Sequence, residues 1–92
     1  MQYCIRYDGV GRLRVRCGQF AFDEKEGYGI AELLKKEDYI LDVISSHQNG
    51  GLLITYANGK RELVLNRLKA ITKDDMKPVE PSDEDLSRKP DL

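Results

Sequence analysis

Apolar and polar residues alternate along the first 17 positions of this 92-residue chain. The apolar residues of the first run are Tyr3, Ile5 and Tyr7, and those of the second are Leu13, Val15 and Cys17. A period of two is typical of a β-strand with one buried face. Residues 8–11, Asp-Gly-Val-Gly, separate the two runs and have the composition of a turn. The sequence therefore predicts a β-hairpin over residues 2–22.

The register of this hairpin follows if both apolar rows face the same side of the sheet. The expected pairs are then Tyr7 with Leu13, Ile5 with Val15, and Tyr3 with Cys17. Cys4 lies opposite Arg16 on the other side. We therefore expect the two cysteines to point to opposite sides of the sheet, where they cannot share one metal ion.

Residues 23–38 have the pattern of a helix with a capped start. Asp23 is a good N-cap residue, and Glu26 follows at the spacing of a capping box. The expected apolar face consists of Tyr28, Ile30, Leu33 and Leu34. Gly27 and Gly29 each cost up to about 1 kcal/mol in a helix interior. They indicate either a loose first turn or the close approach of another backbone segment.

Two more strands and a second helix are predicted in the rest of the chain. Residues 40–47 and 52–57 are rich in β-branched and apolar residues, which favours strands. Asn49-Gly50-Gly51 lies between them and is typical of a hairpin turn. A helix is predicted over residues 60–71, where apolar residues recur at helical spacing: Val64, Leu65, Leu68 and Ile71.

The predicted order of elements is β-β-α-β-β-α. Two helices on one face of a four-stranded antiparallel sheet form an α+β sandwich of the ferredoxin-like type. The 52–57 strand is expected between the 12–17 and 40–47 strands, with a right-handed crossover through the first helix. Folds of this type usually end in a strand, but the segment after Ile71 is polar and contains proline. We therefore expect the N-terminal strand to occupy that edge position instead.

The sequence divides into a folded part, residues 1–71, and a tail, residues 72–92. The tail contains all three prolines and the acidic run of Asp83, Glu84 and Asp85. Residues 1–71 contain 11 Lys or Arg and 9 Asp or Glu, a net charge of +2, whereas the tail contains 4 and 7, a net charge of −3. Such a polar segment buries too little apolar surface to offset the entropy lost on ordering. We expect the tail to be disordered or to act as a linker.

Composition excludes several classes of protein. Two cysteines do not form a disulfide framework, and no apolar run approaches the roughly 18–20 residues that span a bilayer. The N-terminus lacks the apolar region of a signal peptide, so we expect a reducing cytoplasm. A net charge of −1 argues against a general nucleic-acid binder. Catalytic triads, phosphate-binding loops and paired carboxylates are absent at credible spacings, so we do not expect an enzyme.

Several segments together resemble one known family. They are Gly11 to Gly18 (GRLRVRCG), Phe20-Ala21-Phe22, Gly27 to Ile30 (GYGI), and the sequence NGGLLITY that begins at Asn49. Over about residues 1–71 the chain is similar to the heavy-metal-associated-like domain at the N-terminus of bacterial heavy-metal-translocating P-type ATPases. The resemblance implies a non-catalytic, cytosolic accessory or regulatory domain that acts by docking or metal sensing. Its partners would be cytosolic domains of the pump, and the tail would lead to the pump's membrane helices.

Metal-binding members of the wider family carry Cys-x-x-Cys before the first helix, where two thiolates bind a soft cation. At the corresponding positions this chain has Asp23 and Glu26. Two carboxylates are hard ligands that bind copper(I) poorly and zinc weakly. Their spacing also explains them as a helix cap, so they form at most a weak cation site.

Three further residues are candidate ligands for a transition-metal ion such as zinc or copper. Cys17 is also explained as a small buried residue. Cys4 is expected to be more exposed, near Arg6 and Arg16, but is also explained as a residue of an edge strand. His47, the only histidine, lies beside a turn without a companion ligand nearby in the sequence. These residues support an alternative function, a free-standing metal-binding module or metallochaperone-like protein.

Arg12, Arg14 and Arg16 alternate along one strand, so they form a positive stripe on the sheet face away from the helices. Arg6 extends this stripe on the neighbouring strand. Both a solvated surface and a docking surface for an acidic partner explain the pattern. Candidate partners are a pump's cytosolic domains, anionic lipid headgroups and the chain's own acidic tail. RNA is a weaker candidate, because the stripe lacks interleaved aromatic residues for base stacking.

Overall fold

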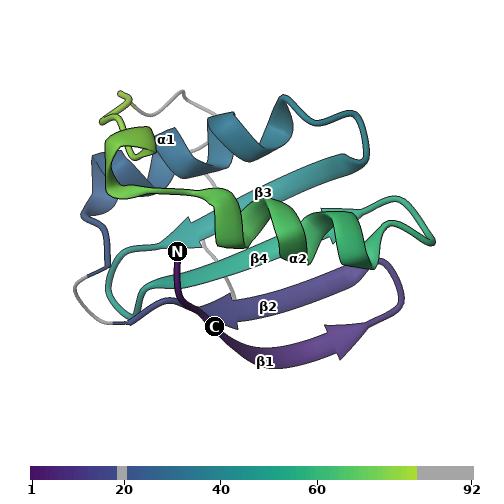
Figure 1. Cartoon of the computed structure of the whole chain (residues 1–92). Coiled ribbons are helices and arrows are strands. Elements are labelled where there is room, and N and C mark those ends of the chain that lie inside the picture. The colour runs from purple at the N-terminus through teal and green to yellow at the C-terminus, as the bar shows by residue number, and fades with distance from the viewer. Residues whose placement is uncertain (19–20, 81–92) are drawn as a thin grey trace.

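The computed structural model describes residues 1–18 and 21–80 of the chain. Its main elements follow the predicted order β-β-α-β-β-α (Figure 1). The strands are β1 (Cys4–Gly9), β2 (Arg12–Arg16), β3 (Ile40–Ser46) and β4 (Gly51–Tyr56). The helices are α1 (Glu24–Lys35), α2 (Arg61–Ala70) and a short 3₁₀ turn, η1 (Lys73–Asp75). All six predicted elements are therefore present close to their expected bounds.

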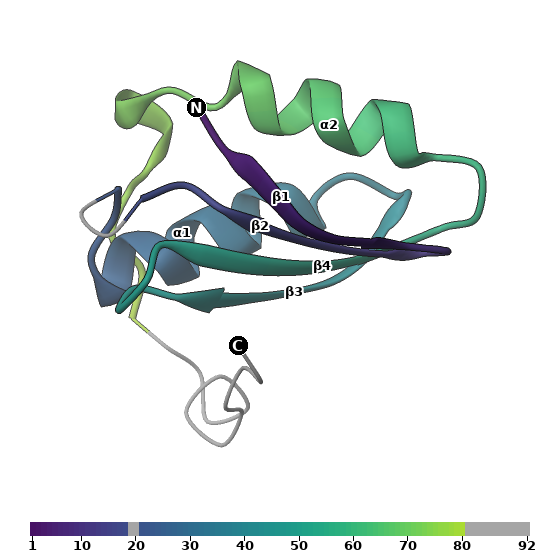
Figure 2. The same cartoon turned by 90° about the horizontal axis from the view of Figure 1, so that it is seen from below.

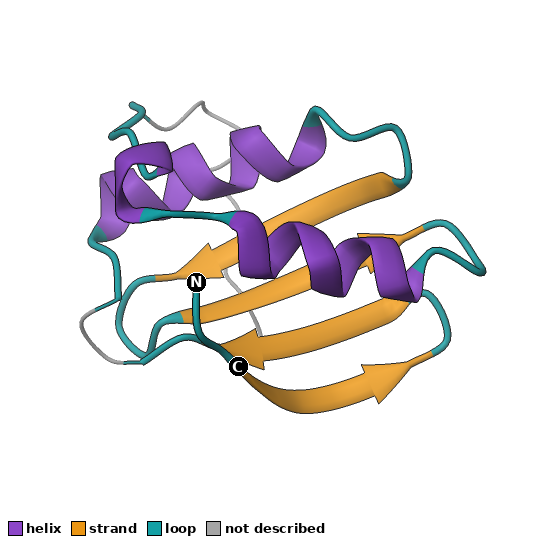
Figure 3. Ribbon diagram, in the orientation of Figure 1, coloured by secondary structure: helices purple, strands orange, loops and turns teal. Residues whose placement is uncertain are grey.

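The four strands form one sheet in the order β1-β2-β4-β3, and every neighbouring pair is antiparallel. β4 lies between β2 and β3, and β1 occupies the edge beside β2, so the predicted strand order is confirmed. Both helices pack on one face of this sheet (Figure 3). The fold is a ferredoxin-like α+β sandwich with the N-terminal strand at one edge. We call the helix-covered side of the sheet the inner face and the opposite side the outer face.

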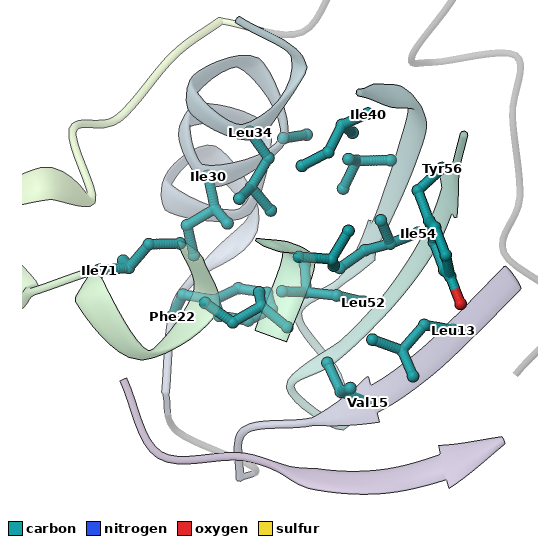
Figure 4. Close-up of a cluster of buried hydrophobic side chains, with 14 of the residues drawn as sticks. Leu13, Val15, Phe22, Ile30, Leu34, Ile40, Leu52, Ile54, Tyr56 and Ile71 are labelled. Atoms are coloured by element: carbon teal, nitrogen blue, oxygen red, sulfur yellow. The ribbon is translucent and has the colours of Figure 1, made fainter. Parts of the chain in front are cut away.

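The hydrophobic core lies between the inner face and the two helices (Figure 4). The helices contribute the fully buried residues Ile30, Leu34, Val64 and Leu68. The strands contribute Leu13, Val15, Leu52, Ile54 and Tyr56. These positions recur every second residue along the strands and every third or fourth residue along the helices. The apolar pattern of the sequence therefore identified the core.

The predicted register of the first hairpin is confirmed in part. The confirmed pairs are Cys4 with Arg16 and Ile5 with Val15. β1 begins only at Cys4, so Tyr3 does not form the predicted strand pair with Cys17. Tyr3 instead packs against the core, and its hydroxyl donates a hydrogen bond to the Leu65 carbonyl at 3.5 Å. The chain leaves the sheet here, and the Met1 ammonium donates hydrogen bonds to backbone carbonyls at the end of α2.

In the second half of β1 the register shifts by one residue, because Arg6 is inserted as a β-bulge. Tyr7 therefore lies opposite Arg14 and not, as predicted, opposite Leu13. An inserted residue turns the side chains that follow it to the other face of the sheet. Tyr7 thus belongs to the outer face, where it is 54% exposed. Asp8 lies on the inner face opposite Leu13, in the position that was predicted for Tyr7.

The opposite edge strand has a similar irregularity. The register of β3 shifts between Ile40 and Asp42, so Leu41 is inserted and is 62% exposed. Bulges are frequent at sheet edges, where they disrupt the regular ladder of backbone hydrogen bonds. Both edges of this sheet are therefore irregular.

The capped start of α1 is confirmed. The Asp23 carboxylate accepts a hydrogen bond from the Glu26 amide at 2.8 Å, and the Glu26 carboxylate accepts one from the Asp23 amide at 3.1 Å. α1 also continues through both of its glycines. A Cβ atom at Gly29 would collide with the carbonyl oxygen of Lys77, so this glycine marks the close approach of a later backbone segment.

The approaching segment is residues 72–80, which we call the strap (Figure 2). The Met76 side chain is buried in the core. The Val79 amide donates to the Lys25 carbonyl at 3.1 Å, and the Lys25 ammonium forms an ion pair with Glu80 at 2.6 Å. The strap is therefore packed on α1.

This packing corrects the expected boundary at residue 71. The folded part of the chain includes the strap, which was expected to belong to a disordered tail or linker. The polar composition of residues 72–92 indicated a tail that does not pack on the domain. The strap packs through one buried side chain, that of Met76, and through backbone contacts, which cannot be predicted from composition. The rest of the expected tail, residues 81–92, lies outside the described residues.

Candidate docking face

β2 presents its arginines on the outer face, as the alternation predicted. Leu13 and Val15 are fully buried on the inner face, and successive side chains of a strand point to opposite faces. The residues on the outer face are therefore Arg12, Arg14 and Arg16. Along an antiparallel strand, residues two positions apart are separated by about 6.8 Å. β2 thus holds three guanidinium groups in one row, with Arg12 exposed and the other two partly buried.

Tyr7 adds an aromatic ring beside this row. It lies opposite Arg14 as a result of the β1 bulge. Its ring covers Gly9, the next residue of β1 on the same face, where a Cβ atom would meet ring carbons at 2.8 Å. Alternation along the sequence places Tyr7 on the inner face, and no pattern in the sequence marks the inserted Arg6. The position of Tyr7 at this site was therefore not predicted from the sequence.

Leu53 forms an apolar centre on the same face. It lies on β4 opposite Arg14, and Ile44 of β3 lies opposite Leu53 in turn. Although Leu53 faces away from both helices, it is only 6% exposed. Together with Tyr7, these residues make one row across all four strands. We call the surface formed by five residues the arginine face: Tyr7, Arg12, Arg14, Arg16 and Leu53.

The strands β1 and β2 contain one carboxylate among their described residues, that of Asp8. Asp8 is turned to the inner face, so the described residues of β1 and β2 place no carboxylate on the outer face. Asp42 of β3 shares a row with Arg12, but Thr55 of β4 lies between them. The half of the outer face over β1 and β2 is therefore positive.

A groove lies beside the arginine face at the β1 edge. It is open, has a volume of about 890 Å³, and its lining includes Tyr3, Cys4, Ile5, Arg6, Arg16 and Cys17. Arg6, expected to extend the arginine stripe, is exposed at the bulge and contributes to this groove instead. The groove thus combines apolar side chains, three cationic side chains (Arg6, Arg16 and Lys69) and both cysteines.

The two thiols of the groove differ in position and chemistry. Cys4 is exposed and shares the outer face with Arg16, whereas Cys17 packs against the core, although both residues line the groove. Burial raises the pKa of the Cys17 thiol from 9.0 to about 11. Because a metal-bound cysteine must lose its proton, this environment disfavours Cys17 as a ligand near neutral pH.

The two carboxylates at the start of α1 already have partners. In addition to the capping hydrogen bonds, Glu26 forms an ion pair with the Lys73 ammonium of the strap at 3.3 Å, and its side chain is only 18% exposed. Lys73 also donates to the Ala21 carbonyl at 3.3 Å. An ammonium group therefore lies where a cation bound by Glu26 would be expected. The arrangement explains Asp23 and Glu26 as a helix cap and an anchor for the strap.

His47 is exposed in the turn that follows β3. Within residues 1–18 and 21–80, no three His, Cys, Asp or Glu side chains come together in a way that could hold a metal ion. In this part of the chain His47 therefore does not belong to a cluster of three such side chains. These candidates are separate positions and not one site.

No protein-family model matches the chain, and no curated protein or solved structure matches it either. In the part of the chain that the structure describes, no helix has the length and apolar character needed to cross a membrane. Function is therefore inferred from the surface of the domain. A row of guanidinium groups beside an apolar centre can bind carboxylates through paired hydrogen bonds and still bury apolar area.

Proposed function

We propose that this chain is a non-catalytic docking domain whose arginine face binds an acidic surface on a partner protein. The observation that supports the proposal is the row of three arginines on the sheet face opposite both helices. Arginine keeps its charge at all physiological pH values and binds carboxylates in a bidentate geometry. Tyr7 and Leu53 add aromatic and apolar contact beside the charges, a composition common in the centres of protein interfaces.

In this proposal the partner follows from the family resemblance. The chain is the cytosolic accessory or regulatory domain of a heavy-metal-transporting P-type ATPase, and it docks on a cytosolic domain of that pump. The segment GRLRVRCG supplies all three arginines of the arginine face. This segment, which is fairly specific for the family in combination with GYGI, thus supplies the charges of the proposed docking surface. Phe20, another residue of the resemblance, lies outside the described residues.

Docking is better supported than metal sensing as the mode of action. The Glu26 carboxylate is engaged by Lys73 and by the Asp23 amide. The Cys17 thiol has a raised pKa because of its burial. A metal at Glu26 would have to displace these contacts, and a metal at Cys17 would have to remove a proton that burial favours, whereas the Arg12 side chain is already exposed.

The experiment that tests the proposal is a calorimetric titration of the full chain with the purified nucleotide-binding domain of the candidate pump. The variant Arg12→Glu/Arg16→Glu is expected to weaken binding by about tenfold or more, because two charges on the interface are reversed. The control variant is Lys35→Glu/Lys36→Glu, which makes the same change in net charge at exposed positions at the end of α1. The control is expected to bind like the native chain.

Two results would contradict this proposal. Equal weakening by both variants would show that the domains respond only to net charge. Tighter binding of single-stranded RNA than of the pump domain, in the same titration, would point to a nucleic-acid partner, for which Tyr7 would be the stacking residue.

A second candidate is a free-standing metal-binding module or metallochaperone-like protein. The observation that favours it is the groove whose lining includes both Cys4 and Cys17. Calorimetric titration of the reduced chain with copper(I) and with zinc separates the two proposals. A dissociation constant below about 1 μM that is lost in either Cys4→Ser or Cys17→Ser would favour the metal-binding module. Binding that survives both substitutions would exclude the groove as the metal site.

A further inference from the structure

The chain contains an acidic segment of its own that is complementary to the arginine face. Asp83, Glu84 and Asp85 are consecutive carboxylates in a region of net charge −3, whereas residues 1–71 have a net charge of +2. In an extended segment Asp83 and Asp85 lie on the same side, about 6.8 Å apart, which is also the spacing of successive arginines on β2. Charge and spacing therefore both match.

The strap brings the chain to the appropriate end of the sheet. Glu80 is held beside the first turn of α1 by its ion pair with Lys25, and Val79 is held by its hydrogen bond to the Lys25 carbonyl. Because α1 follows β2 through residues 17–23, its first turn lies at the end of the sheet where Arg16 is found. In Figure 2 the strap starts near the end of α2 and runs past this end of the sheet, toward the side of the sheet away from α2.

The number of residues beyond the strap sets how far the acidic segment extends from it. Asp83 and Asp85 are three and five residues beyond Glu80, so an extended chain carries them about 10–18 Å from it. The domain measures 31 × 26 × 23 Å along its principal axes. A reach of this size is a large fraction of the shortest extent of the domain.

We propose that Asp83–Asp85 binds the arginine face of the same chain and competes there with the acidic partner. This inference rests on the proposed docking function, because it describes the regulation of that same surface. A ligand on a short tether has an effective concentration of the order of millimolar, so even a weak contact occupies the face for part of the time. A partner then docks only when its own carboxylates displace the segment.

The contact is tested in the full chain by comparing amide resonances of residues 12–16 between the native protein and Asp83→Asn/Glu84→Gln/Asp85→Asn. At an ionic strength of about 0.01 M, where the Debye length is about 30 Å, the substitutions are expected to shift these resonances. At about 1 M, where the Debye length is about 3 Å, the difference is expected to disappear.

The matched control is Glu32→Gln/Asp38→Asn/Asp74→Asn, which removes three charges from exposed positions in α1, in the loop after it and in η1. It is expected to leave the resonances of residues 12–16 in place. Equal shifts in the control, or no shifts in the tail variant at low salt, would overturn the inference. Shifts that grow with protein concentration would also overturn it, because they would indicate contact between different chains.

A second titration separates this inference from the docking function. Poly-L-glutamate serves as the acidic probe, and the tail variant is expected to bind it roughly threefold to tenfold more tightly than the native chain does. If the probe shifts residues 12–16 in both proteins with equal affinity, the segment does not compete and the docking function stands. If the probe shifts these residues in neither protein, the docking function itself fails.

Discussion

The Asp8 carboxylate accepts three hydrogen bonds from the Arg61 guanidinium, with heavy-atom distances of 3.1, 3.0 and 2.6 Å. Arg61 is the first residue of α2, so this contact joins the edge strand β1 to the helix layer. Asp8 faces α2 only because the bulge turns it to the inner face. The insertion of Arg6 therefore has two effects: it orients Asp8 toward Arg61, which attaches β1 to α2, and it places Tyr7 on the arginine face.

Loss of the Asp8–Arg61 contact is expected to weaken the fold slightly. Asp8→Asn and Arg61→Gln should each lower the thermal midpoint at neutral pH by a few degrees, because partly exposed ion pairs contribute modestly. The Arg61 hydrogen bonds hold the pKa of Asp8 below its ordinary value of 3.8. The contribution of the carboxylate is therefore present above that pH and is lost as the pH falls through the lowered pKa.

Thermal unfolding of the native chain, both single variants and the double variant, from neutral pH down to about pH 2, checks this prediction. The difference between the native chain and Asp8→Asn should shrink as the carboxylate becomes protonated. If the two substitutions are simply additive at neutral pH, the two side chains do not interact and the prediction is wrong.

Gly29→Ala is expected to dislodge the strap. The new methyl group would meet the Lys77 carbonyl, so the strap must move, and overpacking of this kind costs about 1–3 kcal/mol. Urea unfolding should show the loss, and hydrogen exchange should show faster exchange of the Val79 amide. Glu32→Ala, at an exposed position of the same helix, is the control and should not destabilise α1. Unchanged Val79 protection in Gly29→Ala would contradict the observed packing.

Met76→Ala tests whether the strap belongs to the folded unit. Met76 is 7% exposed and packs in the core, so its truncation is expected to lower the free energy of unfolding by about 2 kcal/mol or more. Lys77→Ala, at the exposed neighbouring position, should have little effect. Equal stability of the two variants in denaturant unfolding would mean that the folded unit ends before the strap.

The two cysteines are expected to differ in reactivity. At pH 8, iodoacetamide should modify exposed Cys4 well before Cys17, whose burial raises its pKa to about 11. Since the folded pKa lies above the unfolded value of 9.0, the stability linked to the Cys17 proton is complete below pH 9.0 and is lost as the pH rises toward 11. Mass spectrometry of Cys4→Ser and Cys17→Ser during alkylation measures each rate separately, and equal rates would refute the difference in burial.

Much of the architecture was predictable because it depends on local patterns. Alternation over β2 and the glycine-rich turn at Asn49 identified the hairpins, and Asp23 with Glu26 identified the start of α1. The strand order then followed from the usual connections between such elements. The arginine row was found in the same way, because its residues alternate with core residues of the same strand.

The remaining features depend on contacts between distant parts of the chain. The bulge at Arg6 becomes apparent only when β1 is paired with β2, so the position of Tyr7 on the arginine face was not predictable. The strap has a polar composition, and its attachment depends on Met76 entering the core and on Val79 reaching a backbone carbonyl of α1. Gly29 was the one local sign of this attachment, and the sequence did not show which segment approached it.

The irregular edges of the sheet affect what the domain can join. A fifth strand laid along β1 or β3 would meet a break in backbone pairing at Arg6 or Leu41, so neither border offers a continuous template for another chain. Growth by strand addition, including the stacking that leads to fibrils, is therefore discouraged at both sides. A partner protein would therefore bind to the outer face of the sheet, between the edge strands β1 and β3.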